Sequence, residues 1–162
     1  MKYIIYKQKL NKQQQEYLFS KIINIPYIRE KWSEKYWIYI YNEEQTAIED
    51  MLLKAISSVV KMIEVKQDFN TIIIKKFEMG DSIDLQIDFR NRVGKSISII
   101  LGNFTGCNYR IDGKLEEVNS GDIIVQDCTE GYSMGPNYCM YPIASGIKYA
   151  ITICTILKEN PV

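Results

Sequence analysis

Hydrophobic positions follow two different periodicities along the chain, and the change comes near residue 70. Before it, two stretches carry apolar residues every three or four positions, which is the spacing of amphipathic helices. After it, short apolar stretches alternate with glycines, which is typical of strands joined by turns. The pattern therefore predicts a first part that contains helices and a second part made of strands.

The first part also contains two short strands. Residues 2–9 alternate weakly and are rich in Tyr and Ile, and residues 37–41 are dense in aromatic and β-branched residues. Between them, Asn11 and Gln14 have the spacing of a helix-start pair. That helix would end before Pro26, because proline lacks the backbone donor that a helix needs.

The clearest helix begins at Thr46, because Thr46 and Glu49 have the spacing of a capping box. Its length would be about five turns at ~3.6 residues per turn. The apolar residues that follow form a continuous stripe on one face: Ile48, Met51, Leu52, Ala55, Ile56, Val59, Val60 and Ile63. We expect this stripe to pack on a sheet.

The second part predicts at least six strands, which implies a sandwich or a barrel. The whole chain would form one domain, with residues 1–69 supporting a core of residues 70–157. The predicted strands of the core are residues 70–77, 82–89, 96–101, 108–111, 122–126, 139–141 and 148–157.

Charge and composition narrow the function classes. Lys plus Arg and Asp plus Glu are balanced at twenty each, so the chain has no strong nucleic-acid signal. No stretch has the length of a membrane span or the features of a signal peptide, so we expect no membrane association and a cytoplasmic protein. The four cysteines show no Cys-x-x-Cys pair and are expected to be reduced.

Residues 83–88 alternate strictly along one predicted strand. Ile83 shares one face with the other apolar residues, whereas Asp84, Gln86 and Asp88 share the opposite face. By itself this alternation predicts a strand with one solvent-facing side.

A series of motifs follows in a consistent order, and it resembles the oxygenases that depend on ferrous iron and 2-oxoglutarate, in particular prolyl-hydroxylase-like and alkylation-repair-like members. The motifs are Phe77-Glu78-Met79-Gly80, Gln86-x-Asp88, residues 97–101, Asn103-Phe104-Thr105-Gly106-Cys107, residues 120–125, and Tyr138-x-x-x-Pro142 with Gly146-x-Lys148-Tyr149-Ala150-Ile151. The resemblance implies a mainly β fold with flanking helices (α+β). Its core would be a double-stranded β-helix, or jelly roll, with two or three supporting α-helices.

The same resemblance implies a metal site that has lost its usual ligands. In that family, a His-x-Asp pair and a second histidine before a proline hold iron. The matching positions here are Gln86, Asp88 and Tyr138, and the chain has no histidine at all. A glutamine amide and a neutral phenol are weak ligands for ferrous iron. We therefore expect a degenerate triad that binds no metal.

The resemblance also implies an anion site. Lys148 stands where the family places an arginine that binds 2-oxoglutarate, and Thr152 lies four residues on, facing the same way as Ala150. A lysine keeps the positive charge but loses the planar fork of arginine. The alternative is a lysine that faces solvent at the start of a strand.

Other candidate groups leave alternatives open. Residues 129–140 are predicted to form a binding loop, in which Tyr132 would stack on a planar ring, as would Tyr138 and Tyr141. A zinc site is another alternative, although the spacing does not demand one. Its ligands would be Asp88, Asp127, Cys128 and Cys139. Arg90, Arg92 or Lys148 would lower the pKa of Asp88, whereas burial would raise it.

We therefore expect a catalytically degenerate oxygenase-like protein without a cofactor or catalytic residues, which binds or sequesters a small anionic or nucleotide-like ligand. Its ligand-binding residues would be Gln86, Asp88, Tyr138, Lys148, Thr152 and Tyr132. One alternative is a protein-interaction module that binds a protein partner. Another is an active dioxygenase that uses Fe(II) and 2-oxoglutarate with an unusual metal site. The Ile, Lys, Tyr and Asn content suggests an AT-rich genome, such as that of a phage.

Overall fold

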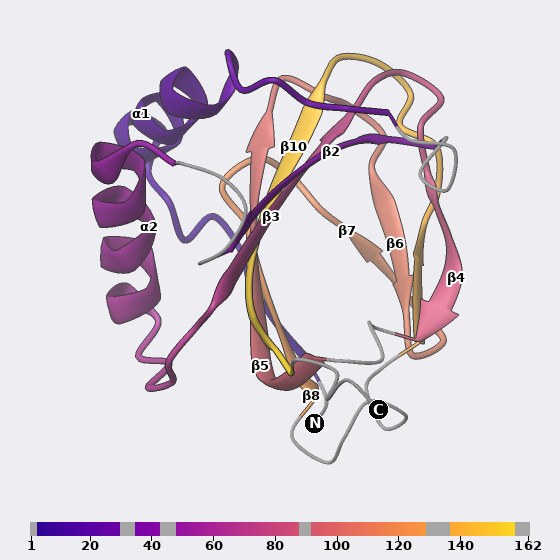
Figure 1. Ribbon diagram of the computed structural model, residues 1–162. Helices are drawn as coiled ribbons and strands as arrows, with labels where there is room; N and C mark the ends of the chain where they lie inside the picture. The colour runs from indigo at the N-terminus through magenta and orange to yellow at the C-terminus, as the bar shows by residue number, and fades with distance from the viewer. Residues whose placement is uncertain (1–2, 30–34, 43–47, 88–91, 129–136, 158–162) are drawn as a thin grey trace, which may run out of the picture.

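The computed structural model describes residues 3–29, 35–42, 48–87, 92–128 and 137–157 (Figure 1). This part of the chain contains two helices and ten strands. The helices are α1 (Lys12–Ile22) and α2 (Asp50–Met62). The strands are β1 (Tyr3–Tyr6), β2 (Trp37–Asn42), β3 (Thr71–Phe77), β4 (Ile83–Ile87), β5 (Arg92–Gly102), β6 (Asn108–Ile111), β7 (Lys114–Glu117), β8 (Ile123–Cys128), β9 (Asn137–Met140) and β10 (Lys148–Ile156).

The strands form two antiparallel sheets that face each other (Figure 1). The larger sheet has six strands in the order β1-β8-β5-β10-β3-β2, and the smaller has four in the order β4-β9-β6-β7. Two facing antiparallel sheets joined by crossing connections make a jelly roll. The predicted fold class is confirmed.

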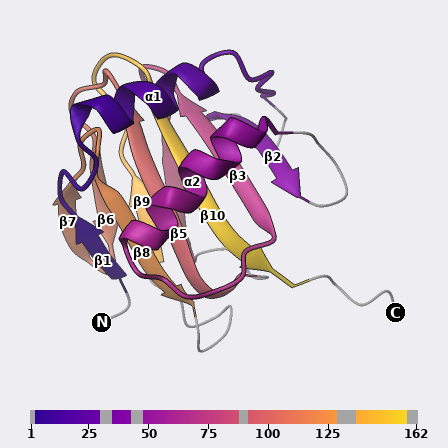
Figure 2. The same ribbon diagram turned by 90° about the vertical axis from the view of Figure 1, so that its left-hand side faces the viewer.

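Both helices lie on the outer face of the six-stranded sheet, and Figure 2 shows them crossing its strands. Its central strands are therefore covered on both sides, by helices on one face and by the small sheet on the other. A strand buried on both faces needs apolar residues at successive positions. This explains the isoleucine runs of β3, β5 and β8.

The alternation along β10 divides the core into two layers. Tyr149, Ile151 and Ile153 belong to the cluster between the sheet and the helices, whereas Ala150 belongs to the cluster between the two sheets. Lys148 and Thr152 have the same parity as Ala150, and both are buried. The face that carries them is therefore the interior of the jelly roll.

The two predicted helix starts had different outcomes. For α1 the prediction is confirmed, since Asn11 accepts a bond from the backbone of Gln14 at 2.8 Å and the Gln14 side chain accepts one from the Asn11 backbone at 2.9 Å. For α2 it is wrong, because the helix begins at Asp50 and its N-cap is Glu49 without a side-chain cap bond. Glu49 is extended, and its carboxylate instead binds Lys21 at 2.9 Å. Thr46 lies outside the described residues.

Three strand predictions need correction. The sequence prediction missed β7, whose side chains are largely exposed, so no buried face marks it. Strand β5 begins at Arg92 instead of residue 96, and it includes Gly94 with a φ of 68°. The strand predicted at residues 139–141 is β9, which spans Asn137–Met140 within the end of the predicted loop and pairs with both β4 and β6.

Neither α1 nor α2, the two helices in the described ranges, is long and apolar enough to cross a membrane.

Candidate functional site

Polar side chains gather on the inner face of the six-stranded sheet, where a jelly-roll core is otherwise apolar. β3 contributes Lys75, β5 contributes Arg92 and Ser98, and β8 contributes Gln126. Lys75, Arg92 and Gln126 are at most 6% exposed. Buried polar groups need hydrogen-bond partners or a ligand, so this face is the candidate site.

These side chains surround a cavity of about 30 Å³ between the sheets. A volume of ~10–15 Å³ holds one water molecule, so the space fits a few atoms. The small sheet closes it from the other side. The remaining lining residues are Phe77, Ile83, Tyr109, Ile111, Ile124, Tyr138, Ala150 and Thr152.

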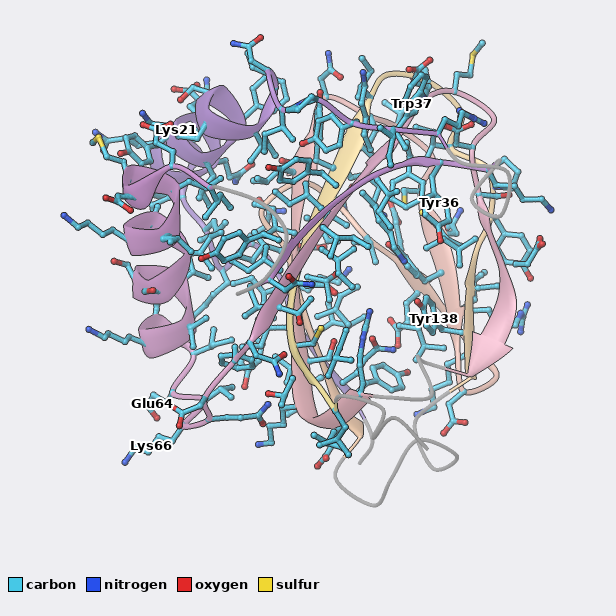
Figure 3. All side chains as sticks on the ribbon, viewed as in Figure 1. Lys21, Tyr36, Trp37, Glu64, Lys66 and Tyr138 are labelled. Carbon is cyan, nitrogen blue, oxygen red and sulfur yellow. The ribbon has the colours of Figure 1, made fainter. Side chains whose placement is uncertain are left out.

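Two cations belong to the cavity wall. Lys75 has its Nζ atom 4.9 Å from the ring centre of Tyr36, and Nη1 of Arg92 donates to Ser96 Oγ at 3.0 Å. Tyr36 lies between the sheets, with its ring 5.4 Å from that of Phe77 (Figure 3). Burial raises the pKa of the Tyr36 phenol, and the charge of Arg92 partly opposes that rise. The ring of Tyr36 thus stabilises the Lys75 ammonium group where water is scarce.

Lys148 lies deeper and has no exposed surface. Its Nζ atom donates to the hydroxyl of Tyr109 and to Met140 Sδ, and it lies 4.5 Å from the ring centres of both Phe77 and Tyr109. Burial lowers the pKa of this lysine to about 8, and the nearby Cys107 thiol partly offsets the shift. The alternative of a solvent-facing lysine is wrong, because β10 starts inside the domain.

Tyr109 connects Lys148 to the cavity. The phenol is wholly enclosed, and burial raises its pKa well above the usual value, so it stays neutral. Its oxygen accepts a hydrogen bond from the Lys148 ammonium group, so the hydroxyl hydrogen can point elsewhere and donate. Since Tyr109 lines the cavity, it can present that hydrogen to a guest there.

The backbone brings together two positions of the predicted triad. Gln86 on β4 and Tyr138 on β9 are Cα partners in the small sheet. Tyr138 is buried and lines the cavity, and Figure 3 labels it in the space between the sheets. Side chains of partner residues project from the same face of a sheet. Position 86 is thus in register with Tyr138, and the register shift between Ile83 and Gln86 interrupts the predicted alternation, since Ile83 also lines the cavity.

The other predicted residues divide into three groups. Thr152 lines the cavity, and its hydroxyl lies 2.9 Å from that of Ser98. Lys148 does not line the cavity but contacts Tyr109 and Phe77, which do. Asp88 and Tyr132 lie outside the described residues, so their parts in the site stay predictions.

Sequence reasoning named Arg92 only as a charge near Asp88, and it missed Lys75, Ser98, Tyr109 and Gln126. Strand parity was the available signal, because Lys75 shares a face with Phe77 and Ser98 shares one with Ile100. It was insufficient, since strands covered on both faces give no hint of which face is the interior.

Known structures share this fold. An oxidoreductase of the 2OG-Fe(II) oxygenase family from Burkholderia pseudomallei has a TM-score of 0.69 at 10% identity, with 94% of this chain and 83% of that chain covered. The viral collagen prolyl hydroxylase of Paramecium bursaria Chlorella virus-1, in complex with 2OG, scores 0.65 at 12% identity, with 97% of each chain covered. A prolyl-4-hydroxylase of Pseudomonas putida scores 0.62 at 15% identity, with 96% and 92% covered.

The chain has the jelly-roll fold of these oxygenases. No protein-family model matches its sequence, and no curated protein matches it. At such identities the likeness extends to the fold alone.

The donor groups do not fit the iron site that the fold family implies. Gln86 and Tyr138 offer an amide and a phenol, and there is no imidazole in the chain. Across the described ranges, no three His, Cys, Asp or Glu residues converge, whether for iron or for the zinc set considered above. Ferrous iron in such enzymes is held by two imidazoles and a carboxylate, so the described residues supply no equivalent.

Proposed function

We propose that this chain is a catalytically degenerate oxygenase-fold protein that binds a small anion between its two sheets. The observation that carries the proposal is the cavity wall, in which Lys75 and Arg92 are buried together with hydroxyl and amide groups. Cations enclosed at a low local dielectric attract an anion more strongly than cations in water do. A buried polar cavity with perturbed titratable groups is also the usual mark of a ligand site.

The cavity supports a small ligand over a nucleotide. A volume of about 30 Å³ accommodates a carboxylate or an inorganic oxyanion, but no nucleobase. The hydroxyl of Thr152 and the neutral phenol of Tyr109 would donate hydrogen bonds to its oxygens. Lys148 would act through Tyr109, because its ammonium group already donates to that hydroxyl.

Binding is preferred to catalysis because of the donor chemistry at the triad positions. An amide and a phenol at Gln86 and Tyr138 would weaken iron binding by far more than the ~10–100-fold that outer-shell changes cost. The protein-interaction alternative stays a prediction. Co-purification with a stoichiometric protein partner, and an empty cavity, would favour it.

The test begins with protein taken directly from cells and examined by native mass spectrometry, which would detect a bound molecule. Calorimetric titration with phosphate, sulfate, acetate, succinate and 2-oxoglutarate then ranks the anions. Thr152→Val should weaken binding of the tightest-binding anion by ~5–10-fold, the equivalent of one lost hydrogen bond. Lys148→Ala should weaken binding of the same anion by ~1–3 kcal/mol.

Thr155→Val is the matched control, because Thr155 lies on the same strand but its hydroxyl donates to the Asp68 backbone at 2.7 Å, outside the cavity. The affinity of this variant for the anion should stay within twofold of that of the unchanged protein. Two results would overturn the proposal: no anion binding at millimolar concentration, or one tightly held ferrous ion per chain with succinate released from 2-oxoglutarate.

A further inference from the structure

A second hollow lies on the opposite face of the six-stranded sheet from the cavity. It is a cleft of about 520 Å³ between α2, residues 65–70 and strands β2, β3 and β10. Ligand pockets for small organic molecules measure ~300–1,000 Å³. The cleft therefore has the size of a site, and neither the inner cavity nor any triad position contributes to it.

The walls of this cleft are apolar and incompletely covered. Ile56, Ile72 and Ile153 form its buried floor. Around them stand apolar side chains that are only half-buried, although they pack against the core cluster: Tyr41, Leu53, Val60, Val65 and Phe69. Removing apolar surface of this kind from water stabilises the complex with a ligand.

Hydrogen bonds hold the lower rim in place. Glu64 ends the helical region with a φ of 58°, which turns the chain back across the sheet. Gln67 then accepts from the Lys95 backbone at 2.8 Å and donates to Thr155 Oγ1 at 3.1 Å. Because these bonds fix the rim to β5 and β10, ligand binding does not have to order this segment first.

Two lysines stand at the mouth. Lys61 and Lys66 are exposed, line the cleft, and form no ion pair within the described ranges. Figure 3 labels Lys66 next to Glu64, beyond the last turn of α2. Among the residues that line the cleft, Asp68 is the one carboxylate, so their net charge is plus one; Glu64 is outside the lining.

We infer that this cleft binds an amphipathic organic monoanion, such as an aliphatic carboxylate. The hydrocarbon chain lies against Ile56, Val60 and Phe69, and the carboxylate faces Lys61 and Lys66. An apolar wall with a cationic mouth matches that ligand in both polarity and sign of charge.

The probe is decanoate, used below the concentration at which it forms micelles, in competition with the fluorescent sulfonate 1-anilinonaphthalene-8-sulfonate. The expected result is one saturable site per chain. Ser57→Glu should weaken decanoate at least tenfold, because Ser57 lines the cleft and the new carboxylate would both repel the ligand and pair with Lys61 one turn away.

Ser58→Glu is the matched control, since Ser58 is the next residue on α2, is equally exposed, and faces the groove between α1 and α2 instead. The affinity of the Ser58→Glu variant for decanoate should stay within twofold of that of the unchanged protein. Lys66→Gln should weaken decanoate several-fold and leave the neutral decanol unchanged. Absence of saturable binding, equal losses in both serine variants, or a Lys66→Gln effect on decanol as large as that on decanoate would each overturn the inference.

Discussion

Gln86 and Tyr138 are Cα partners on the neighbouring strands β4 and β9. The Cβ atoms of such partners lie ~4.5–5.5 Å apart, close enough for two side chains to hold one metal ion. The strand pairing would therefore allow two ligating side chains at these positions, but the amide and the phenol that occupy them are weak ligands for ferrous iron.

Restoring the imidazoles should restore metal binding. The double variant Gln86→His with Tyr138→His is expected to bind Co²⁺, a spectroscopic substitute for Fe²⁺, at least ~100-fold more tightly than the unchanged chain, because imidazole suits these ions. Visible absorption during a Co²⁺ titration measures it.

The two single variants are the controls, and each should bind far more weakly than the double variant. Tyr138→Phe separates metal binding from any loss of stability, since it removes the hydroxyl and keeps the ring in the core. A double variant that binds no better than either single one would show that the register does not bring the two side chains to a common point.

Most of the fold was predictable because periodicity reports burial directly. The apolar stripe of α2 marks one buried face and the alternation of residues 83–88 predicted a strand; both elements exist, although the register shifts within β4. Strand β7 lacks such a face, and Leu115 is 59% exposed. Its signal was the turn before it, where Asp112 and Gly113 take φ values of 50° and 85°, as a two-residue hairpin turn requires.

Less of the site was predictable. Lys148 and Thr152 came from a family resemblance, and the sequence left open whether Lys148 faces solvent or the interior. In contrast, Lys75 and Lys76 are adjacent, and only one of them can face the interior. The choice depends on which sheet face the helices cover, and this is a tertiary relationship that local sequence does not encode.

The capping box of α1 should contribute measurably to stability. Asn11→Ala removes the acceptor of the Gln14 amide and should lower the free energy of unfolding by ~1 kcal/mol. Glu49→Ala at the start of α2 removes no cap bond, only an exposed ion pair, and should cost at most ~0.5 kcal/mol. Urea titration of both variants tests the difference. If both variants lost the same free energy of unfolding, the hydrogen bond to Asn11 would contribute no more than the exposed ion pair of Glu49.

Asp122 should be the most sensitive carboxylate among the ion pairs described. It is fully buried and accepts from the backbones of Gln8 at 2.8 Å and Asn119 at 2.9 Å, which ties the segment after β1 to the turn before β8. Asp122→Ala leaves both donors without a partner and should cost ~2–4 kcal/mol. The urea midpoint measures this loss.

Asp84→Ala is the comparison for that experiment. Asp84 pairs with Lys35 at 2.7 Å, but both side chains are more than half exposed, so its loss should cost at most ~0.5 kcal/mol. If the two variants lost similar stability, the buried acceptor role of Asp122 would be contradicted.

Lys148 should make stability rise with pH above about 8. Its pKa is lowered from 10.5 to about 8 in the folded protein because burial penalises the charge. Between these values the unfolded chain holds more protons than the folded one, so the free energy of unfolding increases with pH. Below pH 8 the charged lysine is a constant cost, of about 3 kcal/mol for a shift of this size.

Lys148→Met removes that cost and places an apolar side chain against Phe77, Tyr109 and Met140. The variant should therefore be more stable by ~1–3 kcal/mol at pH 7. Its free energy of unfolding should no longer rise between pH 8 and 10. Urea titrations at several pH values measure both effects. Lys54→Met on the exposed face of α2 is the control and should change neither. If the Lys148→Met variant is more stable but no longer binds the anion, the buried charge serves ligand binding and not folding. A variant less stable at pH 7 would instead show that the ammonium group is part of the structural core.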